Sequence, residues 1–231
     1  MNRQLHIFYG LKNNDNKISQ GIVDNYNKFI ELNNNFKLEK WNSIRSLEFV
    51  TYYFPNHLDI YKTISDYRYK CDLVRLMVLY IWGGFYMDID CECLCSVNKM
   101  NINDDTDLCI VFNSGKNEIF NSLIYVKNTE NEFIKTCIDA YTNLLKNKNI
   151  GACPIMKTVF DNMYPNYDIG TFNNVVIHQE RPEKQLKDCK TKEEFWLSFY
   201  IYNSNNEKIM KSRYDNYYID RSHKSKIIHF Y

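Results

Sequence analysis

The chain has 231 residues, of which 45% are hydrophobic and 25% charged, and its 29 basic side chains nearly balance its 28 acidic ones. This balance excludes the basic surface that nucleic-acid binding requires, so no nucleic-acid partner is expected. The length and composition suit one globular domain spanning residues 1–231.

The first half of the chain alternates between expected strands and helices. Residues 5–9 read as a strand, 18–32 as a helix, 36–41 as an extended segment and 44–53 as a helix that ends before Pro55. No apolar signal segment precedes the first strand, and the longest apolar stretch, residues 76–87, is too short to cross a bilayer. We therefore expect a soluble, cytoplasmic α/β protein with no transmembrane segment.

The most informative segment runs from residue 72 to residue 90. An apolar helix stops at Gly83 and Gly84, and a short hydrophobic strand follows and ends in Asp88 and Asp90. Successive side chains on a strand alternate faces, so the two carboxylates are expected on one face, roughly 7 Å apart. Mn²⁺ and Mg²⁺ prefer a few carboxylate oxygens together with phosphate and water. This strand end is thus a candidate site for Mn²⁺ (or Mg²⁺) carrying a diphosphate.

Two charged residues lie on the same apolar helix. Asp72 and Arg75 are three residues apart, while their neighbours are apolar on nearly every face, which indicates a buried helix. Buried charges need partners. One interpretation is an ion pair within the helix. The other is that the helix carries both charges to the rim of the pocket into which Asp88 and Asp90 point.

The segments after residue 90 are less distinctive. Cys91, Cys93 and Cys95 lack the usual zinc spacing and are interpreted as reduced, partly buried thiols. Residues 98–105 are expected to form a polar loop beside the site, 107–112 a strand, and 118–126 and 132–145 helices. The alternating order predicts an α/β sheet with helices on both faces and ligands at the carboxyl ends of its strands.

The segment 72–90 resembles a known family. Asp72, Arg75, Tyr86, Asp88 and Asp90 have the spacing of the "DXD" region of glycosyltransferases that include yeast initiating α-mannosyltransferases and bacterial capsule enzymes, and clostridial glucosylating toxins share it. The resemblance implies a retaining enzyme that uses a nucleotide-diphosphate sugar. It also implies the α/β GT-A fold, with a Rossmann-like central sheet that is mixed, mostly parallel and flanked by helices. By that resemblance Asp72 and Arg75 hold hydroxyls of the donor sugar, Asp88 the ribose or sugar, Asp90 the metal, and Tyr86 walls the donor site.

Fainter similarities extend toward both ends of the chain. His6 and Tyr9 match a family strand that ends in His-x-x-Trp, so Tyr9 is a candidate for stacking on the nucleotide base, or an ordinary strand aromatic. Trp41 lies where relatives carry a tryptophan, and residues 150–154 resemble a Gly-Pro turn of the family with two residues inserted. His229, in a strand-like segment at the end of the chain, is a candidate metal or phosphate ligand or a structural histidine.

The expected function is transfer of a sugar, from a UDP-sugar in preference to GDP-mannose, to a glycan or other hydroxyl acceptor. Asp88, Asp90 and Arg75 are the expected catalytic residues. Two alternatives stay open: a non-catalytic sugar-nucleotide-binding protein on the same fold, and a metal-dependent phosphohydrolase, which normally uses more acids and histidines than this segment offers.

Overall fold

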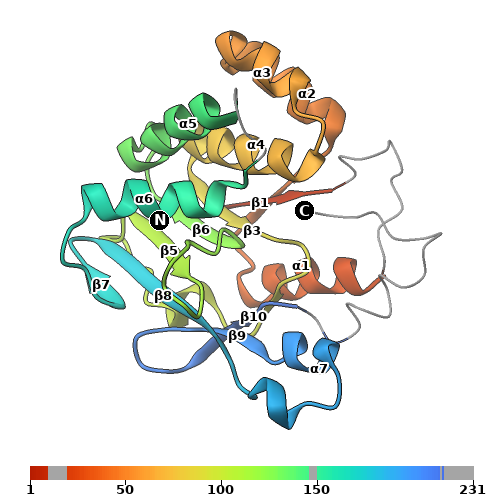
Figure 1. The fold of residues 1–231 in the computed structure, drawn as a ribbon, viewed down its shortest axis with the longest axis vertical. Helices are drawn as coiled ribbons and strands as arrows, with labels where there is room; N and C mark the ends of the chain where they lie inside the picture. Colours follow the sequence, from red (N-terminus) through yellow and green to blue (C-terminus); the bar gives the residue numbers. More distant parts are fainter. Residues whose placement is uncertain (10–19, 146–149, 214, 216–231) are drawn as a thin grey trace.

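The computed structural model describes residues 1–9, 20–145, 150–213 and 215 (Figure 1). Within those residues, ten strands form one sheet. The strands are β1 (Gln4–Phe8), β2 (Lys37–Trp41), β3 (Gly84–Met87), β4 (Glu92–Cys93), β5 (Leu108–Phe112), β6 (Leu123–Val126), β7 (Gly170–Phe172), β8 (Val175–Pro182), β9 (Phe199–Tyr202) and β10 (Lys208–Lys211).

Helices follow and connect these strands. The α-helices are α1 (Gln20–Leu32), α2 (Ser43–Tyr53), α3 (Leu58–Thr63), α4 (Tyr67–Trp82), α5 (Glu132–Leu145), α6 (Ala152–Met163) and α7 (Lys192–Leu197). Short 3₁₀ turns are η1 (Pro55–His57), η2 (Val97–Met100) and η3 (Leu186–Asp188). None of the described helices is long and apolar enough to cross a bilayer.

The sheet is mixed. Its order is β2-β1-β3-β6-β5-β8-β9-β10-β4, with β7 paired to β8. β1 is parallel to β2 and β3, and β5 is parallel to β8, while the remaining ladders between the described strands are antiparallel. The predicted α/β class and mixed sheet are confirmed. Parallel pairing, however, is confined to β1 with its two neighbours and to β5 with β8. The remaining strands of the second half of the chain pair antiparallel with their neighbours.

Apolar side chains fill both faces of the sheet. One cluster joins helices α2 to α6 to the sheet through residues such as Val74, Met77 and Phe160. The other lies beneath α1 and contains Phe29, Phe85 and the Cys91 and Cys93 side chains. Figure 1 shows α4, α5 and α6 stacked on one side of the strands and α1 on the other. This layering leaves the carboxyl ends of β1 and β3 side by side at one edge.

Several predicted elements are confirmed within one or two residues. The strand at β1, the extended segment at β2 and the helices at α2 and α5 lie where the periodicity indicates them. The helix expected at residues 118–126 is wrong: β6 lies there and pairs antiparallel with β3. Its four residues are all fully buried, and so short an apolar run carries no periodicity that separates a strand from a helix.

The polar loop of residues 98–105 also differs from its expected place. The amino group of Met1 donates to Asp104 Oδ1 at 2.7 Å, and Lys127 Nζ donates to the Asp104 carbonyl oxygen. Met1 precedes β1, and Lys127 follows Val126, which pairs with the first residue of β3. The loop therefore packs at the amino ends of these strands, whereas Asp88 follows the carboxyl end of β3.

Candidate active site

Helix α4 carries two of the predicted residues into the core. Asp66 caps its amino end by accepting a hydrogen bond from the Arg68 amide at 2.9 Å. Gly83 ends it with φ 61°, a conformation that favours glycine, and β3 begins one residue later. This tight helix-to-strand connection folds β3 back beneath α4 and so brings the end of the strand toward Arg75.

Arg75 is the centre of the site. Only 3% of its side chain is exposed, and its guanidinium lies 3.3 Å from Asp72 Oδ1 and 3.4 Å from Asp88 Oδ1. Its Nη1 donates to the Asn121 carbonyl oxygen at 2.7 Å, and the group lies 4.3 Å from the centre of the Tyr86 ring. Burial acts to lower the pKa of Arg75, but Tyr86, Asp88 and Asp72 outweigh it and the pKa is raised. The guanidinium is therefore a fixed positive charge between two carboxylates.

Asp72 is held by three groups from different parts of the chain. Besides Arg75, its Oδ1 accepts from Asn121 Nδ2 at 2.9 Å and its Oδ2 accepts from the Ala152 amide at 3.1 Å. Ala152 is the first residue of α6, so the carboxylate meets the positive end of that helix. Burial raises the pKa of Asp72, while Arg75, Ala152 and Asn121 act to lower it. The segment 150–154 thus contacts a predicted site residue.

Tyr86 and Asp88 are joined directly. The Tyr86 hydroxyl donates a short hydrogen bond to Asp88 Oδ1, the oxygen that also faces Arg75. Burial raises the pKa of the Tyr86 hydroxyl well above its ordinary value, so this group remains a donor at neutral pH. The Asp88 side chain is 26% exposed. Its carboxylate is therefore oriented from within the protein while part of it reaches solvent.

Asp88 and Asp90 lie in a turn and not on a regular strand. β3 ends at Met87, and the Cys91 amide donates to the Asp88 carbonyl oxygen at 3.1 Å, which closes a turn over residues 88–91. The Asp88 amide in turn donates to the Ser122 carbonyl oxygen at 2.8 Å. The expectation that strand alternation puts both carboxylates on one face is therefore wrong, because neither Asp88 nor Asp90 belongs to the strand. What holds the half-buried Asp90 near Asp88 is the turn.

Tyr9 lies at the same edge of the sheet but packs on its other face. Its amide donates to the Trp41 carbonyl oxygen at 2.7 Å, directly after the end of β1. The ring packs against the cluster of Ile7, Phe85 and their neighbours, whereas Tyr86 belongs to the cluster on the opposite face. The structure brings Asp72, Arg75, Tyr86 and Asp88 into one contact network. Asp90 lies in the same turn as Asp88, and Tyr9 directly follows the neighbouring strand. His229 lies outside the described residues.

His6, three residues before Tyr9, has structural partners. Its Nε2 is 3.0 Å from the Gly83 carbonyl oxygen, and its Nδ1 accepts from Trp41 Nε1 at 3.3 Å. Burial lowers the pKa of His6 to about 4. The neutral ring therefore ties β1 and β2 to the connection between α4 and β3.

Asn121 and Ser122 contribute to the site but are not predicted from the sequence. Asn121 binds both Asp72 and Arg75, and Ser122 anchors the Asp88 backbone, whereas the sequence predicts a helix over residues 118–126. The only local signal is the polar pair Asn121 and Ser122 before a buried apolar run. Such a pair is compatible with the start of a strand as well as with a helix. Asn121 lies 49 residues from Asp72 along the chain, a separation that no local pattern reports.

The donor chemistry of the turn fits a hard divalent cation. Asp88 and Asp90 each offer carboxylate oxygens in the turn, and the Arg75 guanidinium lies between Asp88 and Asp72. Among the residues that the structure describes, no group of three or more His, Cys, Asp or Glu side chains is arranged to hold a metal ion. Mg²⁺ and Mn²⁺ commonly take one or two protein carboxylates and complete their shell with phosphate oxygens and water.

The nearby thiols have a different character. Cys91 and Cys93 are buried and Cys95 is half-buried, and all three are free. Burial raises the pKa of Cys91 well above its ordinary value and that of Cys93 to about 12. These side chains pack in the core cluster beneath α1, in agreement with their interpretation as buried thiols.

The sequence and fold are similar to known proteins. Residues 19–108 match the family described as "Glycosyltransferase sugar-binding region containing DXD motif". The chain is also 26% identical over 136 residues to an uncharacterized glycosyltransferase of Acanthamoeba polyphaga mimivirus. That match covers 58% of this chain and 45% of the relative, so the chain spans less than half of the relative's length. These two similarities indicate a segment like the sugar-binding region of glycosyltransferases in residues 19–108, the part of the chain that contains Asp72, Arg75 and Asp88.

One solved structure has a similar fold. The PaToxG glycosyltransferase matches with a TM-score of 0.54 and 15% identity, over 72% of this chain and 70% of that one. At this identity the likeness concerns the fold, and it confirms the predicted GT-A-like arrangement of a mixed sheet flanked by helices.

Proposed function

We propose that this protein is a metal-dependent glycosyltransferase that moves a sugar from a nucleotide-diphosphate sugar to a hydroxyl acceptor, with residues 1–231 acting as one domain. The observation that carries the proposal is the buried Arg75, paired with both Asp72 and Asp88 beside the turn that contains Asp90. A buried ion network of this kind is costly to maintain. It suits a site that must present fixed charges and hydrogen-bonding groups to a polar ligand.

Each site residue has a proposed role. Asp72 and Arg75 bind hydroxyls of the donor sugar, and Asp88 binds the ribose or the sugar. Tyr86 supports this role, because its hydroxyl and Arg75 together fix the Asp88 carboxylate. Tyr9 stacks on the nucleotide base from the end of the neighbouring strand.

The cation site is proposed at Asp90 and Asp88, with His229 as a further candidate ligand. Mn²⁺ or Mg²⁺ bound there supplies Lewis-acid stabilisation of the negative charge that develops on the leaving diphosphate. The carboxylate oxygens of Asp88 and Asp90 support a cation, since hard divalent ions prefer such oxygens together with phosphate and water. The fixed positive charge of Arg75 orients the Asp88 carboxylate from inside the protein.

The donor, the acceptor and the stereochemistry of the reaction are proposed from the resemblance to the family. We propose a UDP-sugar as donor in preference to GDP-mannose, a glycan as acceptor and retention of the anomeric configuration. Discrimination among donors depends on a few hydrogen bonds in the pocket, so the donor is a matter for direct assay. The anomeric configuration of the product can be read from its NMR couplings.

A panel of nucleotide sugars tests the proposal. The protein is incubated with UDP-glucose, UDP-galactose, UDP-N-acetylglucosamine and GDP-mannose, each with Mn²⁺, and released nucleotide is measured by chromatography. The proposal predicts release from at least one donor, even where water is the acceptor. Binding of a donor without turnover indicates a non-catalytic sugar-nucleotide-binding protein, and release of inorganic phosphate from simple phosphomonoesters indicates a phosphohydrolase.

A further inference from the structure

A partly exposed aromatic cluster lies on α7 and the first residue of β9, which have no place in the site described so far. Trp196 is 43% exposed, although it is a large aromatic residue. Its ring stacks on Phe199 with centroids 5.2 Å apart and an interplanar angle of 27°, and it meets Phe195 at 5.3 Å and 60°. Phe199 is itself buried. Trp196 therefore has a supported ring with a part that faces solvent.

The backbone around this ring is fixed. Thr191 caps α7 by accepting from the Glu194 amide at 3.1 Å. The Glu194 carboxylate accepts from the Lys190 amide at 2.8 Å and from Lys184 Nζ at 2.7 Å. Ser198 Oγ donates to the Phe195 carbonyl oxygen at 2.7 Å at the other end of the helix. A ring held in this way loses little further freedom when a ligand binds to it.

A chain of contacts links the cluster to the turn that contains Asp88 and Asp90. The Arg213 guanidinium lies 5.6 Å from the centre of the Trp196 ring, and the Ser212 amide donates to the Phe199 carbonyl oxygen at 3.0 Å. Cys91 Sγ donates to the Ser212 carbonyl oxygen at 3.5 Å, and Cys91 closes the turn that holds Asp88. Trp196 and Arg213 are thus connected to the candidate active site through two residues.

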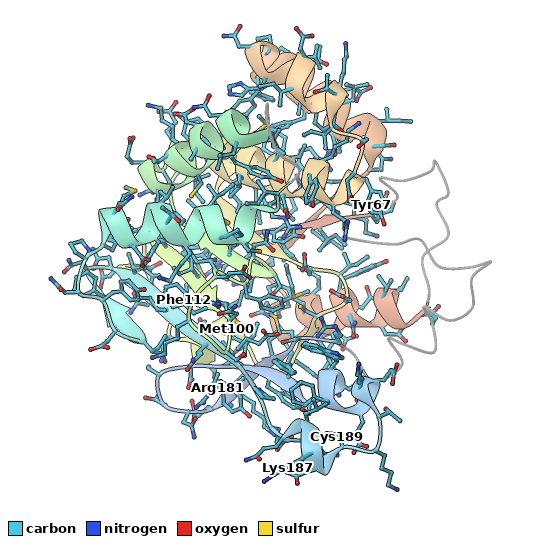
Figure 2. The ribbon with its side chains drawn as sticks, viewed as in Figure 1. Tyr67, Met100, Phe112, Arg181, Lys187 and Cys189 are labelled. Carbon is cyan, nitrogen blue, oxygen red and sulfur yellow. The ribbon has the colours of Figure 1, made fainter. Side chains whose placement is uncertain are left out.

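The charges around α7 favour a neutral ligand. Lys184 pairs with Glu194 at 2.7 Å and Lys208 with Glu183 at 2.5 Å. Acidic and basic residues balance over 180–196, namely Glu180, Glu183, Asp188, Glu193 and Glu194 against Arg181, Lys184, Lys187, Lys190 and Lys192. Figure 2 shows Lys187 at the outer end of this unit and Arg181 nearer the sheet. Because acidic and basic side chains balance over residues 180–196, this surface does not attract a polyanion, and it is not purely apolar either.

We propose that Trp196, with Arg213 beside it, binds the acceptor sugar of the transfer reaction. The C–H groups of a pyranose pack against a flat aromatic ring, and its hydroxyls take hydrogen bonds from polar groups at the rim, a combination that matches an amphipathic Trp next to a guanidinium. The proposal rests on the proposed function, because it assigns the second substrate of the same site. Trp196 is a binding residue here and takes no part in bond breaking.

The test compares transfer with donor hydrolysis. Wild type, Trp196→Ala, Trp196→Tyr and Tyr52→Ala are assayed with Mn²⁺, the active donor, and methyl glycosides of glucose, galactose, mannose and N-acetylglucosamine as acceptors. Trp196→Ala is expected to raise the acceptor KM at least tenfold while donor hydrolysis stays within twofold of wild type. Trp196→Tyr recovers most of the loss. Tyr52, a 78% exposed aromatic on α2, is the matched control, and its loss changes neither reaction.

A binding arm separates this inference from the proposed function. Saturation-transfer NMR with the same methyl glycosides is expected to show contact with wild type and not with Trp196→Ala, whether or not any donor is hydrolysed. A wild-type protein that hydrolyses a donor but neither binds nor glycosylates these sugars overturns the inference, and so does a normal acceptor KM in Trp196→Ala. Absence of nucleotide release from every donor instead defeats the proposed function.

Discussion

Arg75 determines the electrostatics of the candidate site. It is almost fully buried between Asp72 and Asp88, and the Asn121 carbonyl oxygen also depends on it for a donor. Its removal leaves Asp72, only 13% exposed, without its cationic partner. An arginine in this position contributes through several directed hydrogen bonds and through stacking on Tyr86, which lysine cannot reproduce.

We predict that Arg75→Ala lowers the free energy of unfolding by about 3–5 kcal/mol, the usual cost of stranding a buried charge. Urea denaturation at neutral pH measures it, and donor affinity is recorded in parallel. Arg68→Ala is the matched control: Arg68 and Asp66 form a pair whose side chains are 50% and 25% exposed, so the expected cost is at most about 1 kcal/mol. Similar losses in the two variants would show that the Arg75 network adds little to stability.

His6 provides a second test at the residue scale, through pH. Burial lowers its pKa to about 4 from an ordinary value of 6.5, so the folded state favours the neutral ring. The resulting stability is complete above pH 6.5 and is lost as the pH falls toward 4. Between pH 7.5 and 4.5 we predict a loss of about 2–3 kcal/mol from this residue.

The measurement compares the pH dependence of two proteins. Free energies of unfolding are obtained for wild type and His6→Gln across this range, so that the contributions of other groups, including His178, cancel in the difference. Wild type is expected to lose stability more steeply than the variant on acidification. Parallel curves for the two proteins contradict the interpretation of His6 as a buried neutral tie between strands.

At the scale of elements, the connection between α4 and β3 sets the geometry of the site. Gly83 and Gly84 have φ of 61° and 88°, and a Cβ on Gly84 would lie 2.7 Å from the Gln4 carbonyl oxygen of β1. That atom belongs to the backbone and cannot move aside cheaply. The close approach is what allows β1 and β3 to pair directly after the helix ends.

We predict that Gly84→Ala destabilises the protein by roughly 2 kcal/mol or more, because strain and a backbone clash act together. Thermal unfolding measures the effect, and nucleotide-sugar turnover is expected to fall with it because Asp88 follows the same strand. Gly115→Ala is the control, since a Cβ there meets only the Asn117 side chain, at 3.1 Å, and requires no unusual backbone. Equal melting temperatures for the two variants would contradict this account.

The sequence predicted the elements that carry a long or regular pattern. Helix α5, helix α2 and strand β1 follow from apolar periodicity, and the segment 72–90 follows from its charged residues in an apolar context. β6 was missed because its four buried residues pair with β3, a tertiary contact without a local signal. The turn at residues 88–91 was missed because a strand pattern does not reveal where hydrogen bonding to the neighbouring strand stops.

At the scale of the whole molecule, the candidate site forms only when distant segments assemble. Asp72 binds Asn121 and Ala152, which are 49 and 80 residues away, and Arg75 binds Asn121 across 46 residues. The site therefore requires α4, β3, the segment before β6 and the start of α6 to be in place together. The sequence could identify four charged or polar members of this network and the segment 150–154. It could not identify Asn121 or the contact of the Ala152 amide with Asp72, because these contacts exist only in the folded chain.

The turn after β3 is proposed to bind a cation and a nucleotide sugar for transfer. Nucleotide release from the most active donor is measured for wild type, Asp88→Asn and Asp90→Asn with Mn²⁺, after chelation and after Mn²⁺ is restored, with melting temperatures recorded throughout. Asp105→Asn, an exposed carboxylate in the loop of residues 98–105, is the control. The account predicts metal-dependent release by wild type and the control, and a loss of at least about tenfold in both site variants with the fold retained, since each substitution removes a charge and not a packing group. Release above a tenth of wild type in both site variants, or release that is unaffected by chelation, would contradict it.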